Sequence, residues 1–216
     1  MNDLTRPPPG DPPRLVLASG SPRRAELLKQ LGLTFDVVIP RVNEQPLAGE
    51  DPISLVIRLA RAKAATVRQS RDVSSDVVLA ADTVVVVDGT ILGKPENRDQ
   101  GIGMLNMLSG NTHCVVSGVA IESENDSDFF HVETKVRFRT LTNEEAARYW
   151  QSGEPADKAG GYGIQGMGAI FVAAIQGSYT NVVGLPLAET AATLKNFGID
   201  CLGDSVTANV TETDNG

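Results

Sequence analysis

Short apolar runs alternate with amphipathic stretches along most of the chain. Apolar runs bounded by turn residues predict buried strands, and apolar positions repeating every three to four residues predict helices. Strands are predicted at 14–18, 35–39, 77–87, 90–92, 112–122, 129–140 and 169–175, and helices at 22–31, 52–67, 97–108, 142–151 and 186–198, with a loop at 153–168. Strands and helices that alternate without a strict repeat predict an α/β fold, a mixed twisted sheet flanked by helices in two lobes with a cleft between them.

Both ends of the chain lack this pattern. Residues 1–13 are rich in proline and residues 204–216 are polar, so each end predicts a disordered tail around a domain at 14–203. Hydrophobic residues make up 41% of the chain, which is ordinary for a globular protein. No apolar run approaches the ~20 residues that a membrane-spanning helix needs, so we expect no membrane partner.

The net charge of −8 is concentrated in three segments. The tail 1–13 contributes −1, the acidic stretch 122–130 contributes −4 and the tail 204–216 contributes −3, so the predicted body is about neutral. A nucleic-acid-binding protein needs a broad basic surface. A neutral body with a few local arginines therefore favours a small anionic ligand over a nucleic acid.

Cysteine and histidine are too scarce for several kinds of site. Cys114 and Cys201 are too few for a disulfide framework, and the only histidines, His113 and His131, do not form a pair with zinc-ligand spacing. A zinc site or a Ser-His-Asp triad is therefore not expected. The cysteine usage predicts a reducing, cytoplasmic setting.

The stretch LVLASGSPRR, residues 15–24, predicts a strand that leads directly into a helix. Ser21 is the expected N-cap and Pro22 the first helical residue. A helix start offers free backbone N–H groups to an anion, and Arg23 and Arg24 add positive charge suited to phosphate or carboxylate. The alternative is a capped helix with two solvated arginines.

Charged side chains also occur at positions where a core is expected. Asp82, followed by Thr83, interrupts the apolar strand 77–87, and a buried carboxylate needs a metal or a cationic partner. The alternative is an aspartate that pairs with an arginine for the fold alone. Lys63 lies on the apolar face of helix 52–67, either pointing inward or snorkelling from the edge of that face. Thr83 is expected to point to the opposite face from Asp82 if the strand is regular.

Two further residues follow predicted strands. Glu44 comes shortly after strand 35–39 and could join Asp82 as an oxygen ligand of Mg²⁺, because this ion is held by one or two carboxylates together with substrate phosphates. Lys94 follows strand 90–92 and could reach a phosphate, although such a residue is also common in an ordinary loop. The chain has no G-x-x-x-x-G-K-[ST] motif, which argues against a P-loop kinase.

Several motifs occur in a fixed order over residues 14–198. They are LASGSPRR, the glutamate of NEQP, RLARAKA, AADTVV, GKP, DKAGGYGIQG and GSYTNVVGLPL. Together they resemble the Maf family of nucleoside triphosphate pyrophosphatases. The resemblance implies hydrolysis of a nucleoside triphosphate to the monophosphate and pyrophosphate, with a divalent cation (Mg²⁺, or Mn²⁺ or Co²⁺ as alternatives) and a homodimeric enzyme.

The resemblance also implies roles for individual residues. Asp82 becomes the general base and a metal ligand, with Glu44 beside it on the metal. The implied phosphate contacts are Ser19, Arg24, Lys63 and Lys94. SPRR, ADT and YGIQG are similar to the subgroup that acts on dTTP and UTP, in which Arg23, Thr83 and Gln165 are associated with the choice of base.

A second class of function stays open at this stage. The family takes its name from a link to septum formation, so a nucleotide-sensing regulator of division with little need for turnover is the alternative. The presence of Asp82, Glu44 and Lys63 together favours the enzyme, because a pure sensor could lose its base.

Overall fold

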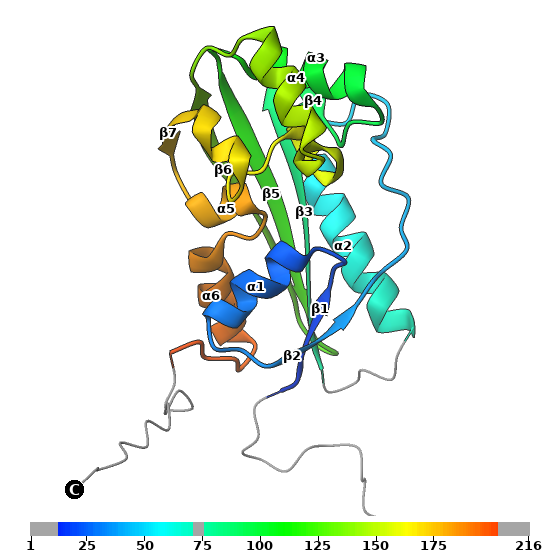
Figure 1. The fold of residues 1–216 in the computed structure, drawn as a ribbon. Helices are drawn as coiled ribbons and strands as arrows, with labels where there is room; N and C mark the ends of the chain where they lie inside the picture. The colour runs from blue at the N-terminus through cyan, green and yellow to red at the C-terminus, as the bar shows by residue number, and fades with distance from the viewer. Residues whose placement is uncertain (1–12, 71–75, 203–216) are drawn as a thin grey trace, which may run out of the picture.

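One seven-stranded mixed sheet forms the framework of the molecule (Figure 1). The computed structural model describes residues 13–70 and 76–202, so the predicted disordered tails lie outside the described residues except for Pro13. The strands are β1 Leu15–Ala18, β2 Phe35–Val38, β3 Val77–Val87, β4 Thr90–Leu92, β5 Thr112–Glu122, β6 Ser127–Phe138 and β7 Val172–Gln176. The helices are α1 Pro22–Gln30, α2 Pro52–Ser70, α3 Arg98–Leu108, α4 Asn143–Gln151, α5 Tyr179–Val183 and α6 Leu187–Asn196. The predicted α/β class with a mixed sheet is confirmed.

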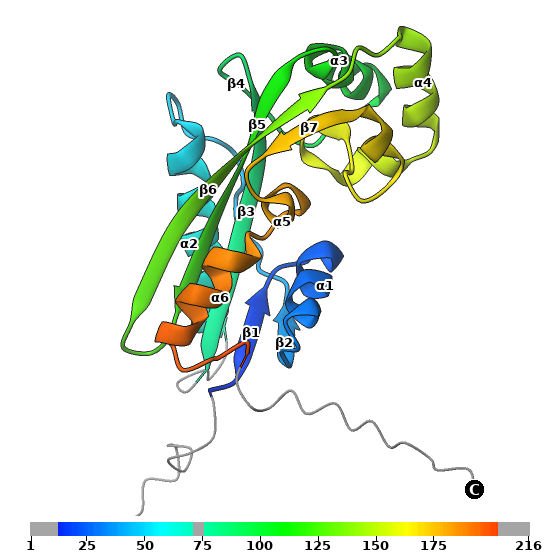
Figure 2. The same cartoon turned by 90° about the vertical axis from the view of Figure 1, so that its left-hand side faces the viewer.

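The sheet combines parallel and antiparallel pairs in the order β2-β1-β3-β5-β6-β7, with β4 paired to β3. Strand β1 is parallel to both β2 and β3, and β5, β6 and β7 continue the sheet as antiparallel neighbours. Figure 2 shows α2 against one face of the sheet and α1, α5 and α6 on the other. None of the described helices is both long enough and apolar enough to cross a membrane.

Strand β3 is buried on both faces because helices cover both. Its residues Val78 and Ala80 pack with Ala60 and Ala64 of α2. Residues of the opposite parity, such as Leu79, face the larger core cluster that α1, α3 and α6 supply. This explains why β3 reads as a continuous apolar run in the sequence.

The boundaries differ from the prediction mainly in the glycine-rich region. The predicted loop 153–168 contains the short 3₁₀ helices η1 Glu154–Asp157 and η2 Ala159–Gly161. The strand predicted at 169–175 begins only at Val172, because Met167–Phe171 forms a third 3₁₀ helix, η3. A further helix, α5, occupies part of the predicted connection after β7, with the Ser178 side chain as its N-cap. Such short turns depend on local i→i+3 bonds, which leave no long hydrophobic period in the sequence.

The sheet is open along one side of β3. Pairing with β1 ends at Ala18 and Ala80, and pairing with β4 begins at Val85. Residues 81–84 therefore pair only with β5 among the described strands. Ligands of open α/β sheets bind beyond the carboxyl ends of parallel strands, where neighbouring strands diverge. This gap contains Asp82 and Thr83.

Candidate functional site

The turn from β1 into α1 has the predicted form but a different capping hydroxyl. Ser21 occupies the N-cap position with extended backbone angles, and Pro22 opens the helix as expected. The Ser21 side chain makes no capping bond; instead the Ser21 backbone N–H donates to Ser19 Oγ at 3.2 Å. Ser19 is buried directly after β1, and this bond holds its hydroxyl at the N-terminus of α1.

Arg24 is held by three acceptors from three different parts of the chain. Its Nε donates to the Gly184 carbonyl at 2.8 Å, its Nη1 to Ser19 Oγ at 3.2 Å and its Nη2 to Thr83 Oγ1 at 3.1 Å. Burial lowers the pKa of the guanidinium, and the negative charges of Asp82 and Glu44 offset part of that effect. A guanidinium has five N–H donors, so the bonds to these described residues leave two for an anionic ligand.

Thr83 and Asp82 lie on opposite faces of the sheet, as predicted. The pairing of β3 with β5 runs through Asp82↔Gly118 and Thr83↔Ser117 without a register shift, so no bulge turns the two side chains together. Thr83 Oγ1 lies 2.8 Å from Ser117 Oγ and accepts from Arg24 on the α1 face. Asp82 points toward α2, where its carboxylate meets Lys63.

Asp82 and Glu44 converge on one buried ammonium group. Lys63 Nζ lies 2.7 Å from Asp82 Oδ1 and 2.6 Å from Glu44 Oε1. Lys63 is 7% exposed and Asp82 is 8% exposed, so the Lys63 side chain points inward and does not snorkel to the surface. The cationic partner of Asp82 is this lysine, not the arginine expected if Asp82 served the fold alone. Burial alone would raise the pKa of Glu44, but the hydrogen bond and charge of Lys63, with Lys94 and Arg24, hold it below its ordinary value.

These residues bring hard oxygen donors and positive charge into one place. Lys94 is exposed after β4, and its charge acts on Glu44. No group of three or more His, Cys, Asp or Glu side chains in the described part of the chain could hold a metal by itself. Two carboxylates on one cation do suit a divalent ion that takes its other ligands from a phosphate chain and water.

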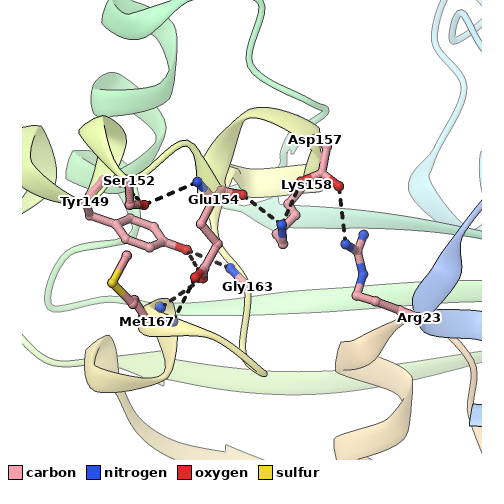
Figure 3. Close-up of polar contacts among 9 residues, drawn as sticks. Arg23, Tyr149, Ser152, Glu154, Asp157, Lys158, Gly163 and Met167 are labelled. Carbon is pink, nitrogen blue, oxygen red and sulfur yellow. Dashed lines mark hydrogen bonds and ion pairs between the residues drawn. The ribbon is translucent and has the colours of Figure 1, made fainter. Parts of the chain in front are cut away.

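Arg23 and Gln165 lie outside this cluster. Arg23 Nη1 is 3.4 Å from Asp157 Oδ2 of η1, a contact visible in Figure 3. Gln165 is exposed on a turn and makes no hydrogen bond or ion pair to any described residue. Arg23 is nonetheless linked to the segment that carries Gln165, because η1 precedes that turn by a few residues.

Sequence reasoning missed three residues that shape the site. The hydroxyl of Ser117 contacts Thr83. Ser117 could have been found by the signal that identified Asp82, a polar residue in an otherwise apolar strand. Gly184 and Asp157 belong to the quoted motifs GSYTNVVGLPL and DKAGGYGIQG, but their contacts with Arg24 and Arg23 join segments far apart in the chain.

Comparison with known proteins gives a consistent family. The sequence profile of the Maf-like protein family matches residues 14–197. A dTTP/UTP pyrophosphatase of Hahella chejuensis is 47% identical over 192 residues, covering 88% of this chain and 96% of the relative. A dTTP/UTP pyrophosphatase of Symbiobacterium thermophilum is 49% identical over 187 residues, covering 86% of this chain and 94% of the relative.

A solved structure is also similar, at a much lower level. It is a nucleoside-triphosphatase / dITP/XTP pyrophosphatase of Mycobacterium abscessus with 16% identity, a TM-score of 0.37, and coverage of 65% of this chain and 92% of that chain. This likeness is too low to bear on function. The profile match and the high identities confirm the resemblance drawn from the motifs, and the chain belongs to the Maf-like protein family.

Proposed function

We propose that this protein is a nucleoside triphosphate pyrophosphatase that hydrolyses dTTP and UTP to the monophosphate and pyrophosphate. The observation that carries the proposal is the convergence of Asp82 and Glu44 on Lys63, near an Arg24 with two N–H donors that no described residue takes. Carboxylates and fixed cations at the open side of β3 are the groups that a metal-bound triphosphate requires. The names of the close relatives agree with this activity.

Each residue has a definite task in this proposal. Asp82 accepts the proton of the attacking water, and Asp82 and Glu44 would hold a divalent metal, Mg²⁺ being our choice. That metal, when bound, would neutralise charge on the phosphates. Ser19, Arg24, Lys63 and Lys94 contact the phosphates, and Lys63 also balances the two carboxylates while no substrate is present.

Base choice is assigned to residues outside the carboxylate cluster. The Gln165 amide offers both a donor and an acceptor, which matches the N3–H and carbonyl oxygens of thymine or uracil. Arg23 lies at the start of α1, and we expect it to approach the base from the side opposite Gln165. The Thr83 hydroxyl is already bonded to Arg24 and Ser117, so we expect Thr83 to act through Arg24.

Two properties of the molecule complete the proposal. We expect a homodimer, as the family resemblance implies, and light scattering on the purified protein measures this directly. We also expect a cytoplasmic enzyme, in keeping with Cys114 and Cys201, which are both free thiols in the structure.

Product analysis tests the proposed function. Purified protein is incubated with Mg²⁺ and dTTP, UTP, ATP or GTP, and the products are separated by ion-exchange chromatography. We expect monophosphate and pyrophosphate, with dTTP and UTP turned over well ahead of the purine nucleotides. Orthophosphate as the primary product would contradict cleavage between the α and β phosphates, and equal kcat/KM for all four would contradict the base preference.

A further inference from the structure

Glu154 makes an unusual number of hydrogen bonds for a residue at the start of a short 3₁₀ helix. Its Oε1 accepts from Tyr149 Oη at 2.7 Å and from the Gly168 N–H at 3.1 Å. Its Oε2 accepts from the Met167 N–H at 2.8 Å. The Glu154 backbone N–H donates to Ser152 Oγ at 3.2 Å, so the residue is held through both its main chain and its carboxylate (Figure 3).

The bonds of Glu154 and Tyr149 enclose the turn that carries Gln165. Tyr149 Oη accepts from the Gly163 N–H at 2.9 Å, before the turn, while Glu154 accepts from Met167 and Gly168, after it. Tyr149 is buried and its ring packs edge-on against Phe171 at 5.0 Å between centroids. Gln165 is therefore presented by a loop whose two sides are tied to one tyrosine–glutamate pair.

The loop fits directly against the Glu154 carboxylate. A Cβ atom at Gly166 would lie 2.3 Å from Glu154 Oε2, and one at Gly163 would lie 2.9 Å from Oε1. Glycine at both positions allows the backbone to reach this close. Burial would raise the pKa of Glu154, but the Tyr149 hydroxyl, the two amides and Lys158 keep it below its ordinary value, so the side chain accepts all these bonds as a carboxylate.

The other end of η1 contacts Arg23. Asp157 Oδ2 accepts from Arg23 Nη1 at 3.4 Å, and Asp157 Oδ1 accepts from Lys158 Nζ at 2.6 Å. Lys158 Nζ also donates to the Glu154 carbonyl at 2.8 Å, which ties the two ends of η1 together. One short helix thus touches both candidate base-selecting elements, the Gln165 loop and Arg23 (Figure 3).

We infer that Glu154 is a positioning residue for base selection, because it sets the Gln165 loop at a fixed distance from Arg23. This rests on the proposed function, in which Gln165 and Arg23 read the base. Glu154 has no described contact with Asp82, Lys63 or Glu44, so its loss should disturb the choice of nucleotide far more than the chemical step.

The test uses Glu154→Gln and Tyr149→Phe, with Glu144→Gln as the matched control. The first variant has one side-chain oxygen where the carboxylate has two, so its NH₂ group must face at least one N–H donor. The second variant keeps the ring but loses the bonds to Gly163 and Glu154. Glu144 is an exposed glutamate on α4 that pairs with Arg148. Replacing it removes the same charge without touching the loop.

Two readouts separate positioning from general stability. Amide hydrogen exchange at Gly163, Met167 and Gly168 should quicken about tenfold or more in the two test variants, since a lost bond lowers the free energy of local opening. The ratio of kcat/KM for dTTP to that for GTP should fall by about tenfold, mainly through a higher KM for dTTP, with kcat within about threefold of wild type. Glu144→Gln should change neither readout, and Gln165→Glu should show the same loss of base preference.

Failure of the inference and failure of the proposed function give different results. A wild type without base preference would overturn the proposed substrate choice and the inference with it. A selective wild type whose two test variants remain equally selective, or whose loop amides exchange at the wild-type rate, would overturn the inference alone. A loss of kcat equal for all nucleotides would also overturn it, because that result marks a structural role.

Discussion

Lys63 is the residue on which the candidate site depends. Its ammonium group is buried and lies within 2.7 Å of two carboxylates, so these contacts replace the water that Lys63 and Asp82 lose, while the Glu44 side chain stays about half exposed. Removing one member of a buried ion pair usually costs several kcal/mol, because the remaining charge stays desolvated. The triad softens this penalty, since Lys63 retains Glu44 if Asp82 is neutralised.

The variant Asp82→Asn should therefore fold but not turn over. We expect kcat to fall at least ~100-fold, the low end of what a positioned general base contributes. The melting temperature should be unchanged or higher, because Lys63 keeps Glu44 as its partner and the substitution removes one desolvated carboxylate, which offsets the broken pair. Asp76→Asn is the control, since Asp76 is also buried and lies just before the same strand. A large drop in melting temperature for Asp82→Asn would instead make Asp82 a structural residue.

At the scale of elements, β3 serves both layers of the molecule. Its alternation sends Asp82 to the α2 face and Thr83 to the α1 face, and its gap between β1 and β4 leaves these residues at an open side of the sheet. A single strand can therefore direct a carboxylate toward Lys63 on one face and a hydroxyl toward Arg24 on the other.

Strand β5 carries a buried histidine that should make folding pH-dependent. Burial lowers the pKa of His113 to about 4, and its Nε2 lies 2.8 Å from Tyr162 Oη. The unfolded chain binds this proton near pH 6.5, so the free energy of unfolding should fall as the pH drops from about 6.5 to about 4. A pKa difference of this size between the folded and unfolded states corresponds to about 3 kcal/mol of unfolding free energy.

Urea unfolding at several pH values measures this slope. His113→Phe should keep the edge-on ring contacts with Phe138 and Tyr162 and flatten the curve between pH 6.5 and 4 relative to wild type. Carboxylates that titrate in the same range affect both proteins and cancel in the comparison. Identical slopes for the two proteins would show that His113 does not carry the effect.

At the scale of the whole molecule, the site assembles from segments spread over most of the chain. The β1–α1 turn, α2, β3 and the stretch around Gly184 all contribute, and Arg23 adds a contact to η1. Lys63 acts as the cation between Asp82 and Glu44 within the protein itself.

Metal removal should separate activity from folding. EDTA should abolish turnover of dTTP while lowering the melting temperature by no more than a few degrees, because an ion held by only two protein carboxylates stabilises the fold by the small amount RT ln(1 + [M]/Kd). Added Mg²⁺ should restore the rate. Undiminished turnover in EDTA would contradict the metal, and a large fall in melting temperature would contradict the role of Lys63 as the internal cation.

Much of the fold follows from local patterns that the sequence alone displays. The apolar runs and helical periods located the strands and helices to within a few residues, because these elements bury one or two faces with a fixed period. The same pattern marked Asp82 as a charge in a buried strand and predicted that Thr83 faces the other way, since strand geometry sets side-chain direction.

The tertiary structure alone decided which groups meet. Nothing local indicates that Arg24 bonds the carbonyl of Gly184, 160 positions later. The position of Lys63 between two carboxylates and the bonds of Glu154 around the Gln165 loop arise in the same way. The physical reason is that secondary structure depends on neighbours along the chain, whereas buried polar groups choose partners from whatever the packed elements place within hydrogen-bond reach.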